Sequence, residues 1–231
     1  MSVRIFAHRG ASAELPENTM AAFRRALELG ADGLELDIHA TRDGVLVVSH
    51  DPDGRRRAGV AERLADLTYE EALRWDVGGG ERLPRLEDVV TEFSHVPLNV
   101  DLKRDIADAT VALLRRLGAE ERVCLASFQA RTLRRVRALG YRGPTALARP
   151  EVLTALAVPA AFRRGPFRCR AVRAQLPLSL GRPWVVARMK ALGLAVDFWT
   201  VDDPELARRL VALGADGIFT NDPRRIIPAL R

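Results

Sequence analysis

Cysteine and lysine are scarce in this chain of 231 residues, and each scarcity narrows what the protein can be. Its two cysteines, Cys124 and Cys169, lie in apolar or mixed stretches that form neither a disulfide framework nor a thiolate metal pattern, so we expect reduced core residues. Arginine carries nearly all of the positive charge, and lysine occurs only at Lys103 and Lys190. Because an ammonium and a planar guanidinium are not interchangeable, Lys103 is a candidate functional residue.

Long hydrophobic runs are also absent. The longest apolar stretch, residues 152–162, is too short to cross a bilayer and is broken by Pro159. The chain enters strand-like sequence by Val3 without a signal-peptide pattern. We therefore expect a soluble, cytoplasmic protein with no transmembrane segment. A hydrophobic content of 48% is enough for the core of one large α/β domain or two small ones.

Aromatic residues make up only 6% of the chain, which bears on its net charge of +6. A clustered basic surface would suit nucleic acid, because it would neutralise phosphates. The arginines are instead spread over residues 55–57, 131–142 and 163–173, without the interleaved aromatic side chains of a single-strand binder. We interpret them as solvated faces and expect no nucleic-acid partner.

The most informative stretch, residues 31–51, begins with strict alternation of apolar and polar residues. Leu34, Leu36 and Ile38 share one side of a strand, and Glu35, Asp37 and His39 share the other. The Cα atoms of Glu35 and Asp37 are expected to lie ~6.6 Å apart, so both carboxylates could reach one cation. The alternative is a solvent-facing edge strand with no functional role.

Other polar residues are expected near the same strand end. A turn at residues 42–44 and an apolar run over 45–49 predict a hairpin-like return that brings His50 back toward the carboxylates. The strand over 3–10 ends in His8 and Arg9, and the strand over 97–103 carries Asp101 and Lys103 on its polar face. A histidine after a strand is also a common structural hydrogen-bonding group, so His50 gains its weight from these neighbours.

The order of elements predicts a TIM (β/α)8 barrel, as a single compact domain over residues 1–231 with a short insertion after the second strand. A first helix is expected over 18–29 with Asn18 as its N-cap. The insertion at 52–83 includes a short helix at 68–75, and a further short helix is expected after it, at 86–93. Further strands are expected at 123–128, 144–148, 171–176, 195–201 and 217–220, and helices at 106–117, 130–139, 150–162, 184–192, 204–213 and 223–230. A doubly wound open sheet is the alternative, but no Gly-rich dinucleotide fingerprint follows the first strand.

The candidate strand-end groups together have the composition of a phosphoryl-transfer site. Three carboxylates suit a hard cation such as Mg²⁺ or Ca²⁺, and two histidines could act as base and acid near neutral pH. Two cationic side chains could bind an anionic oxygen. The set indicates a metal-dependent phosphodiesterase. Its members are His8, Arg9, Glu35, Asp37, His50, Asp101 and Lys103.

Several ordered short motifs resemble those of the glycerophosphodiester phosphodiesterase family over nearly the whole chain. They are His8-Arg9-Gly10, Glu17-Asn18-Thr19, Glu35-Leu36-Asp37, residues 41–44, His50-Asp51, residues 84–87, Trp199-Thr200-Val201 and residues 214–220. The resemblance implies a TIM barrel that hydrolyses small-molecule glycerophosphodiesters, such as glycerophosphocholine, to glycerol 3-phosphate and an alcohol. It further implies metal ligation by Glu35, Asp37 and Asp101 and acid/base catalysis by His8 and His50. Arg9 and Lys103 would contact phosphate, and Trp199 would line the glycerol side or, equally, pack in the core.

Two residues depart from the family pattern. The family usually has Glu at the position of Asp101 and Asp at the position of Asn221; the second position is expected to belong to a terminal turn. Some relatives act on lysophospholipids, and the basic stretch at 52–83 leaves that alternative open. A barrel that binds phosphorylated ligands or nucleic acid without turnover is a further alternative, which would explain the charge but not the two histidines beside three carboxylates.

Overall fold

The computed structural model describes residues 3–157 and 171–231, in which strands and helices alternate regularly. The strands are β1 (Arg4–His8), β2 (Gly33–Ala40), β3 (Leu46–Val48), β4 (Leu98–Leu102), β5 (Val123–Ala126), β6 (Arg173–Pro177), β7 (Ala195–Trp199) and β8 (Gly217–Thr220). The helices are α1 (Met20–Glu28), α2 (Tyr69–Ala72), α3 (Leu86–Glu92), α4 (Ala107–Arg116), α5 (Ala130–Ala138), α6 (Arg149–Ala157), α7 (Pro183–Ala191), α8 (Pro204–Ala212) and α9 (Pro223–Leu230). Short 3-10 helices, η1 (Leu64–Asp66), η2 (Glu120–Arg122) and η4 (Leu178–Leu180), lie in the connections. The end of the helix expected over 150–162, and Cys169, lie outside the described residues.

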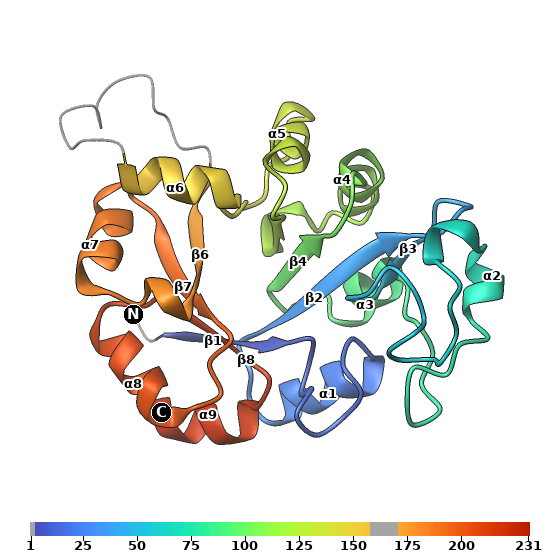
Figure 1. Ribbon diagram of the computed structural model, residues 1–231, viewed down its shortest axis with the longest axis horizontal. Coiled ribbons are helices and arrows are strands. Elements are labelled where there is room, and N and C mark those ends of the chain that lie inside the picture. The colour runs from blue at the N-terminus through green and yellow to red at the C-terminus, as the bar shows by residue number, and fades with distance from the viewer. Residues whose placement is uncertain (1–2, 158–170) are drawn as a thin grey trace.

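The parallel sheet curls into a barrel with its helices on the outside (Figure 1). Its strand order is β5-β4-β2-β1-β8-β7-β6, and β3 pairs antiparallel with β2. The strand expected at 144–148 forms only isolated parallel bridges, from Leu125 to Thr145 and from Ala146 to Arg173. Pro144 has no N–H to donate and α6 begins soon afterwards, so this segment is too short for a full ladder. The two bridges still join β5 to β6, which completes the predicted (β/α)8 barrel.

The two faces of β2 divide as the alternation predicts. Leu34, Leu36 and Ile38 are fully buried in a core that includes side chains of α1 and α3. Glu35 and Asp37 are on the opposite face and are only 6% and 1% exposed, in a strand held between β1 and β4. The alternative of a solvent-facing edge strand is therefore wrong, and the carboxylates lie inside the barrel.

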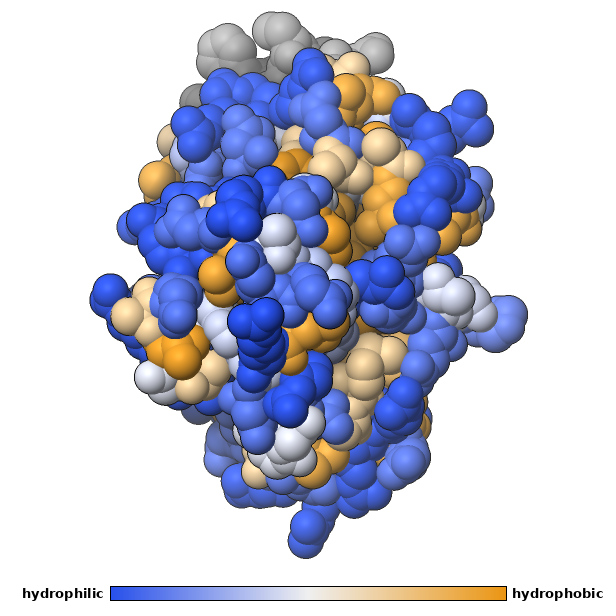
Figure 2. All heavy atoms as spheres, turned by 90° about the vertical axis from the view of Figure 1, so that its right-hand side faces the viewer, coloured by the Kyte–Doolittle hydropathy of each residue, from blue (hydrophilic) through white to orange (hydrophobic). Residues whose placement is uncertain are grey.

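The insertion after the second strand forms a lobe beside the barrel. Antiparallel pairing of Ile38 with Val48 returns the chain along β2, and the following residues reach α3 through η1 and α2. The lobe has a small hydrophobic core of its own, which includes Val47, Leu64 and Trp75. Figure 2 shows the face on this side of the molecule, where hydrophilic residues dominate and hydrophobic ones form small separate patches. Among the described residues, each helix is too short or too polar to cross a bilayer.

Candidate active site

The turn after β1 places a backbone donor against the first carboxylate. Arg9 has a left-handed backbone (φ +60°), and its N–H lies 2.9 Å from the carbonyl oxygen of Glu35 and 3.1 Å from Oε2 of the same residue. Gly10 follows with φ +82°, and a Cβ there would lie 2.7 Å from Ala22 in α1. Only glycine fits this close approach without strain, so the His-Arg-Gly motif has a local structural reason.

Lys103 lies between two of the predicted carboxylates. Its Nζ is 2.7 Å from Oδ1 of Asp37 and 2.6 Å from Oδ2 of Asp101. Arg9 Nε is 3.0 Å from the other oxygen of Asp37, Oδ2. Glu35 belongs to the same group, because its Oε2 accepts from the Arg9 N–H. The barrel thus brings together five of the residues that the sequence predicts for the site.

Asn18 belongs to this cluster, although the sequence suggested a helix cap. Its Nδ2 donates to Oδ2 of Asp37 at 3.1 Å, and its backbone is left-handed (φ +58°). The N-cap of α1 is Thr19, whose side chain accepts from the N–H of Ala22. The expectation for Asn18 was wrong because asparagine and threonine are both good caps, and the buried Asp37 takes the asparagine amide.

Burial and mutual repulsion act on the carboxyl groups in different ways. Burial raises the pKa of Glu35 well above its ordinary value, and the charges of Asp37 and Asp101 raise it further. Burial also raises the pKa of Asp37, but Lys103 and Arg9 outweigh it and hold that pKa below its usual range. The pKa of Lys103 is raised by the same two aspartates in spite of burial, so its ammonium stays charged. With all three carboxyl groups ionised, Lys103 and Arg9 leave one negative charge of the cluster uncompensated.

The oxygen atoms of the cluster suit a hard cation in number and type. Oδ1 of Asp101 and Oδ1 of Asn18 are buried without a hydrogen-bond partner, which is costly unless another group binds them. A divalent cation would also relieve the repulsion that raises the pKa of Glu35. Within the part of the chain that the structure describes, no three acidic, histidine or cysteine side chains are arranged around a common point for an ion. The Lys103 ammonium lies between the two aspartates instead.

His8 is held by a residue from the opposite end of the chain. Its Nδ1 lies 2.7 Å from Oδ1 of Asn221, and its Nε2 lies 3.8 Å from Oε2 of Glu35. Burial lowers the pKa of His8, and the hydrogen bond to Asn221, which raises it, does not compensate. The expectation that position 221 belongs only to a terminal turn was therefore wrong.

His50 is held by its own neighbour in the sequence. The hairpin return is real, since the N–H of Ser49 donates to the carbonyl oxygen of Asp37 at 2.9 Å. His50 Nδ1 lies 2.8 Å from Oδ1 of Asp51, whose other oxygen accepts from Nε of Arg56 at 2.6 Å. Burial raises the pKa of Asp51, but these two partners hold it below its usual value.

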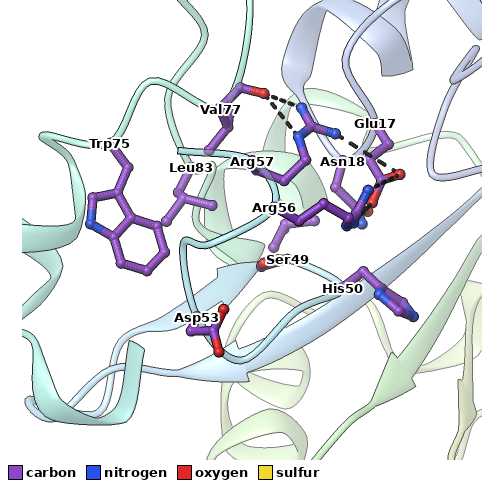
Figure 3. A pocket seen from close by; sticks show the side chains of 11 residues that line it. Glu17, Asn18, Ser49, His50, Asp53, Arg56, Arg57, Trp75, Val77 and Leu83 are labelled. Carbon is purple, nitrogen blue, oxygen red and sulfur yellow. Dashed lines mark hydrogen bonds and ion pairs between the residues drawn. The ribbon is translucent and has the colours of Figure 1, made fainter. Parts of the chain in front are cut away.

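Arg56 links the insertion to the turn after β1. Its guanidinium also contacts Glu17, at 2.6 and 3.2 Å, and Glu17 in turn lies 3.2 Å from Nη1 of Arg9. Figure 3 shows Arg56 and Arg57 reaching toward Glu17 across a small pocket, with His50 at its edge. The interpretation of residues 55–57 as a solvated face is therefore wrong for Arg56 and Arg57, which line this pocket beside His50.

Trp199 lies at the mouth of the barrel, partly exposed at the end of β7. Its ring meets that of Phe128 edge to face, with centroids 5.8 Å apart. Phe128 is 56% exposed, and the Nζ of Lys103 lies 5.9 Å from its ring centroid. Phe128 is a site residue that the sequence did not single out, because one aromatic residue after a strand carries no pattern.

Comparison with known proteins agrees with this arrangement. The model of the glycerophosphoryl diester phosphodiesterase family matches residues 8–225. The chain is 33% identical to a glycerophosphodiester phosphodiesterase of Caldanaerobacter subterraneus subsp. tengcongensis, covering 100% of this chain and 99% of that protein. It is 41% identical over 109 residues to a lysophospholipase D of Homo sapiens, covering 42% of this chain and 35% of that protein. The crystal structure of glycerophosphodiester phosphodiesterase from Agrobacterium tumefaciens strain C58 superposes with a TM-score of 0.85 at 25% identity, covering 98% of each chain.

The family match extends from the first histidine of the cluster to the helix that ends the barrel. The relatives therefore share both the barrel and the stretches that bring its strand ends together. A full-length identity above 30% to a named phosphodiesterase agrees with the hydrolase interpretation of the site. We conclude that the chain belongs to the glycerophosphoryl diester phosphodiesterase family and is a glycerophosphodiester phosphodiesterase.

Proposed function

We propose that the protein hydrolyses glycerophosphodiesters to glycerol 3-phosphate and an alcohol with the help of a divalent cation and two histidines. The observation that carries the proposal is that His8, Glu35, Asp37 and Lys103 lie together at one end of the barrel. Nε2 of His8 is 3.8 Å from Oε2 of Glu35, and Nζ of Lys103 is 2.7 Å from Oδ1 of Asp37. Few structural roles require so many buried charges in one place, because each is costly to desolvate.

The residues that would hold the cation are Glu35, Asp37 and Asp101. When bound, a divalent cation gathers the nonbridging phosphate oxygens and offsets their charge. When all three carboxyl groups are ionised, Arg9 and Lys103 leave one negative charge, so a divalent cation and a singly charged phosphodiester would together make the cluster neutral. The charge balance thus supports Mg²⁺ or Ca²⁺ rather than a monovalent ion.

His8 and His50 would act as the acid/base pair. One takes the proton of the attacking nucleophile, and the other donates a proton to the leaving alkoxide, so that the P–O bond breaks without releasing a free alkoxide. Each ring is fixed through Nδ1, His8 by Asn221 and His50 by Asp51, which leaves Nε2 of each for proton transfer. Arg9 and Lys103 would contact the phosphate, and Trp199 would line the glycerol side beside Phe128.

The test is hydrolysis of bis(p-nitrophenyl) phosphate and of a panel of glycerophosphodiesters, with glycerol 3-phosphate measured by a coupled assay. We expect activity that EDTA abolishes and that Mg²⁺ or Ca²⁺ restores. Turnover that persists in EDTA would contradict the role of the cation, and binding without any turnover would favour a phosphate-binding barrel.

Lysophospholipids are a second substrate class. The local identity of 41% to the human lysophospholipase D favours them, as does the exposed aromatic pair of Phe128 and Trp199 at the mouth of the site. Lysophosphatidylcholine in the same panel decides between the classes, because release of lysophosphatidic acid rather than glycerol 3-phosphate would identify an acylated substrate.

A further inference from the structure

The two ring nitrogens of His8 have different surroundings. Nδ1 faces the side-chain oxygen of Asn221 at 2.7 Å, whereas Nε2 faces the cluster and lies 3.8 Å from Oε2 of Glu35. In a neutral imidazole only one nitrogen carries a proton, and the partner of the other nitrogen decides which one. The orientation of the Asn221 amide therefore decides which nitrogen of His8 is free to react.

Asp202 determines that orientation. It accepts the N–H of Asn221 at Oδ1 (2.7 Å) and the Nδ2 of the same residue at Oδ2 (2.8 Å). The hydroxyl of Thr220 also donates to Oδ1 of Asp202 (2.9 Å). The oxygen of this hydroxyl accepts from the N–H of Asp222, so its proton points toward Asp202. Turning the amide over would bring its oxygen to 2.8 Å from a carboxylate oxygen, with no proton between them.

With the amide held in this way, its oxygen can only accept from His8. The hydroxyl of Ser12 lies 3.1 Å from the same amide oxygen and 2.9 Å from the carbonyl oxygen of His8. Because both of these oxygens are acceptors, the Ser12 hydroxyl acts as a donor here. We propose that Asn221 and Asp202 are positioning residues that keep the proton of neutral His8 on Nδ1 and leave Nε2 free toward the substrate. This inference rests on the proposed role of His8 in proton transfer.

The arrangement differs from that of the second histidine. His50 meets a carboxylate directly, whereas the carboxylate of Asp202 acts on His8 through an intervening amide. The negative charge is thereby one residue further from the ring. Asn221 and Asp202 also form a matched pair: an aspartate at 221 would face Asp202 across 2.8 Å, and only exchange of both residues would keep one amide beside one carboxylate.

The first test is the tautomer of His8, measured by long-range ¹H–¹⁵N NMR of the ring nitrogens at a pH where the ring is neutral. His8→Gln removes its signals and so assigns them among the four histidines. We expect a protonated Nδ1 and an unprotonated Nε2 in the wild-type protein, and a mixture of tautomers in Asn221→Ala. A protonated Nε2 in the wild-type protein, or an unchanged tautomer in Asn221→Ala, would overturn the proposal.

The second test uses turnover. A misplaced proton or ring costs about 10²-fold in rate, so we expect kcat of Asn221→Ala to fall by about that factor with little change in KM. Asn221→Asp should also be impaired, because its carboxylate would repel that of Asp202. Adding Asp202→Asn should recover at least 10-fold of a loss of about 10²-fold and keep the proton of His8 on Nδ1. A double variant no better than Asn221→Asp would contradict the matched pair.

The two proposals fail in different ways. If His8→Gln retains normal turnover, His8 has no part in catalysis and its proposed role in proton transfer is wrong, whatever the tautomer. If His8→Gln is inactive but the wild-type ring carries its proton on Nε2, the proposed function stands and the role of Asn221 and Asp202 is refuted.

Discussion

Removing the Lys103 ammonium is the most direct way to separate charge balance from cation binding. Lys103→Met keeps much of the aliphatic length but leaves Asp37 and Asp101 facing each other without the nitrogen that lies 2.7 and 2.6 Å from them. Loss of one partner from a buried ion pair costs about 3–5 kcal/mol. The lower end applies here, because Lys103 is 17% exposed at its side chain and Arg9 still neutralises Asp37.

We therefore expect cation-free Lys103→Met to be about 3 kcal/mol less stable than the wild-type protein. For a chain of this size, that loss lowers Tm by roughly 6–12 °C. Mg²⁺ should recover part of the loss, since a divalent ion can take the position between the aspartates, whereas turnover should stay about 10²-fold below wild type because the phosphate loses a cationic contact.

The chain supplies a matched control in its other lysine. Lys190 forms an ion pair with Asp216, but both side chains are more than a third exposed, so screening by solvent limits the pair to about 0–1 kcal/mol. Lys190→Met should thus have nearly normal stability and turnover. Urea unfolding with and without Mg²⁺, and calorimetric titration of the cation, measure both effects. Equal stabilities of the two variants without the cation would refute the buried pair, and loss of cation binding in Lys103→Met would make Lys103 an organiser of the ligands.

Other substitutions test the remaining parts of the site. His8→Ala and His50→Ala should each lower kcat by about 10² to 10⁴ in folded protein, and near-normal turnover in either would remove that histidine from the mechanism. Asp101→Asn should sharply lower metal-dependent turnover by removing a charge, whereas Asp101→Glu should remain active; equal Mg²⁺ titrations of wild type and Asp101→Asn would leave Asp101 as no more than a partner of Lys103. Arg56→Ala should lower kcat several-fold with little loss of stability, because the Arg56 side chain is half exposed, while Arg55→Ala, whose side chain is 73% exposed, should not change kcat.

Much of the barrel and its carboxylate face could be predicted from the sequence, because alternation alone separates the interior of β2 from its helix-facing side. Glu35 and Asp37 are found in this way, and their burial agrees with it. The strand expected at 144–148 forms only isolated bridges, because proline and short length weaken its pairing without changing its apolar pattern.

Residues that act through a contact distant in sequence were missed or misjudged. The hydrogen bond from His8 to Asn221 spans 213 positions, and no local pattern marks it. Asparagine favours helix starts, so the sequence predicts a cap at Asn18. Only the fold shows that Asp37 lies close enough to accept a hydrogen bond from the Asn18 amide. Amide side chains fit turns, caps and buried networks equally well, so their roles depend on what the fold brings close.

The register of the parallel strands explains why these particular residues meet. His8 is the registered partner of Glu35 between β1 and β2, and Asp37 is that of Asp101 between β2 and β4. On the other side of β1, Ala7 is registered with Thr220, and His8 and Asn221 are the residues that directly follow this pair. A slip of one residue in a pairing would turn one of each pair to the helix-facing side. The buried apolar residues that hold the register, such as Leu34 and Leu36, therefore position the active site without touching it.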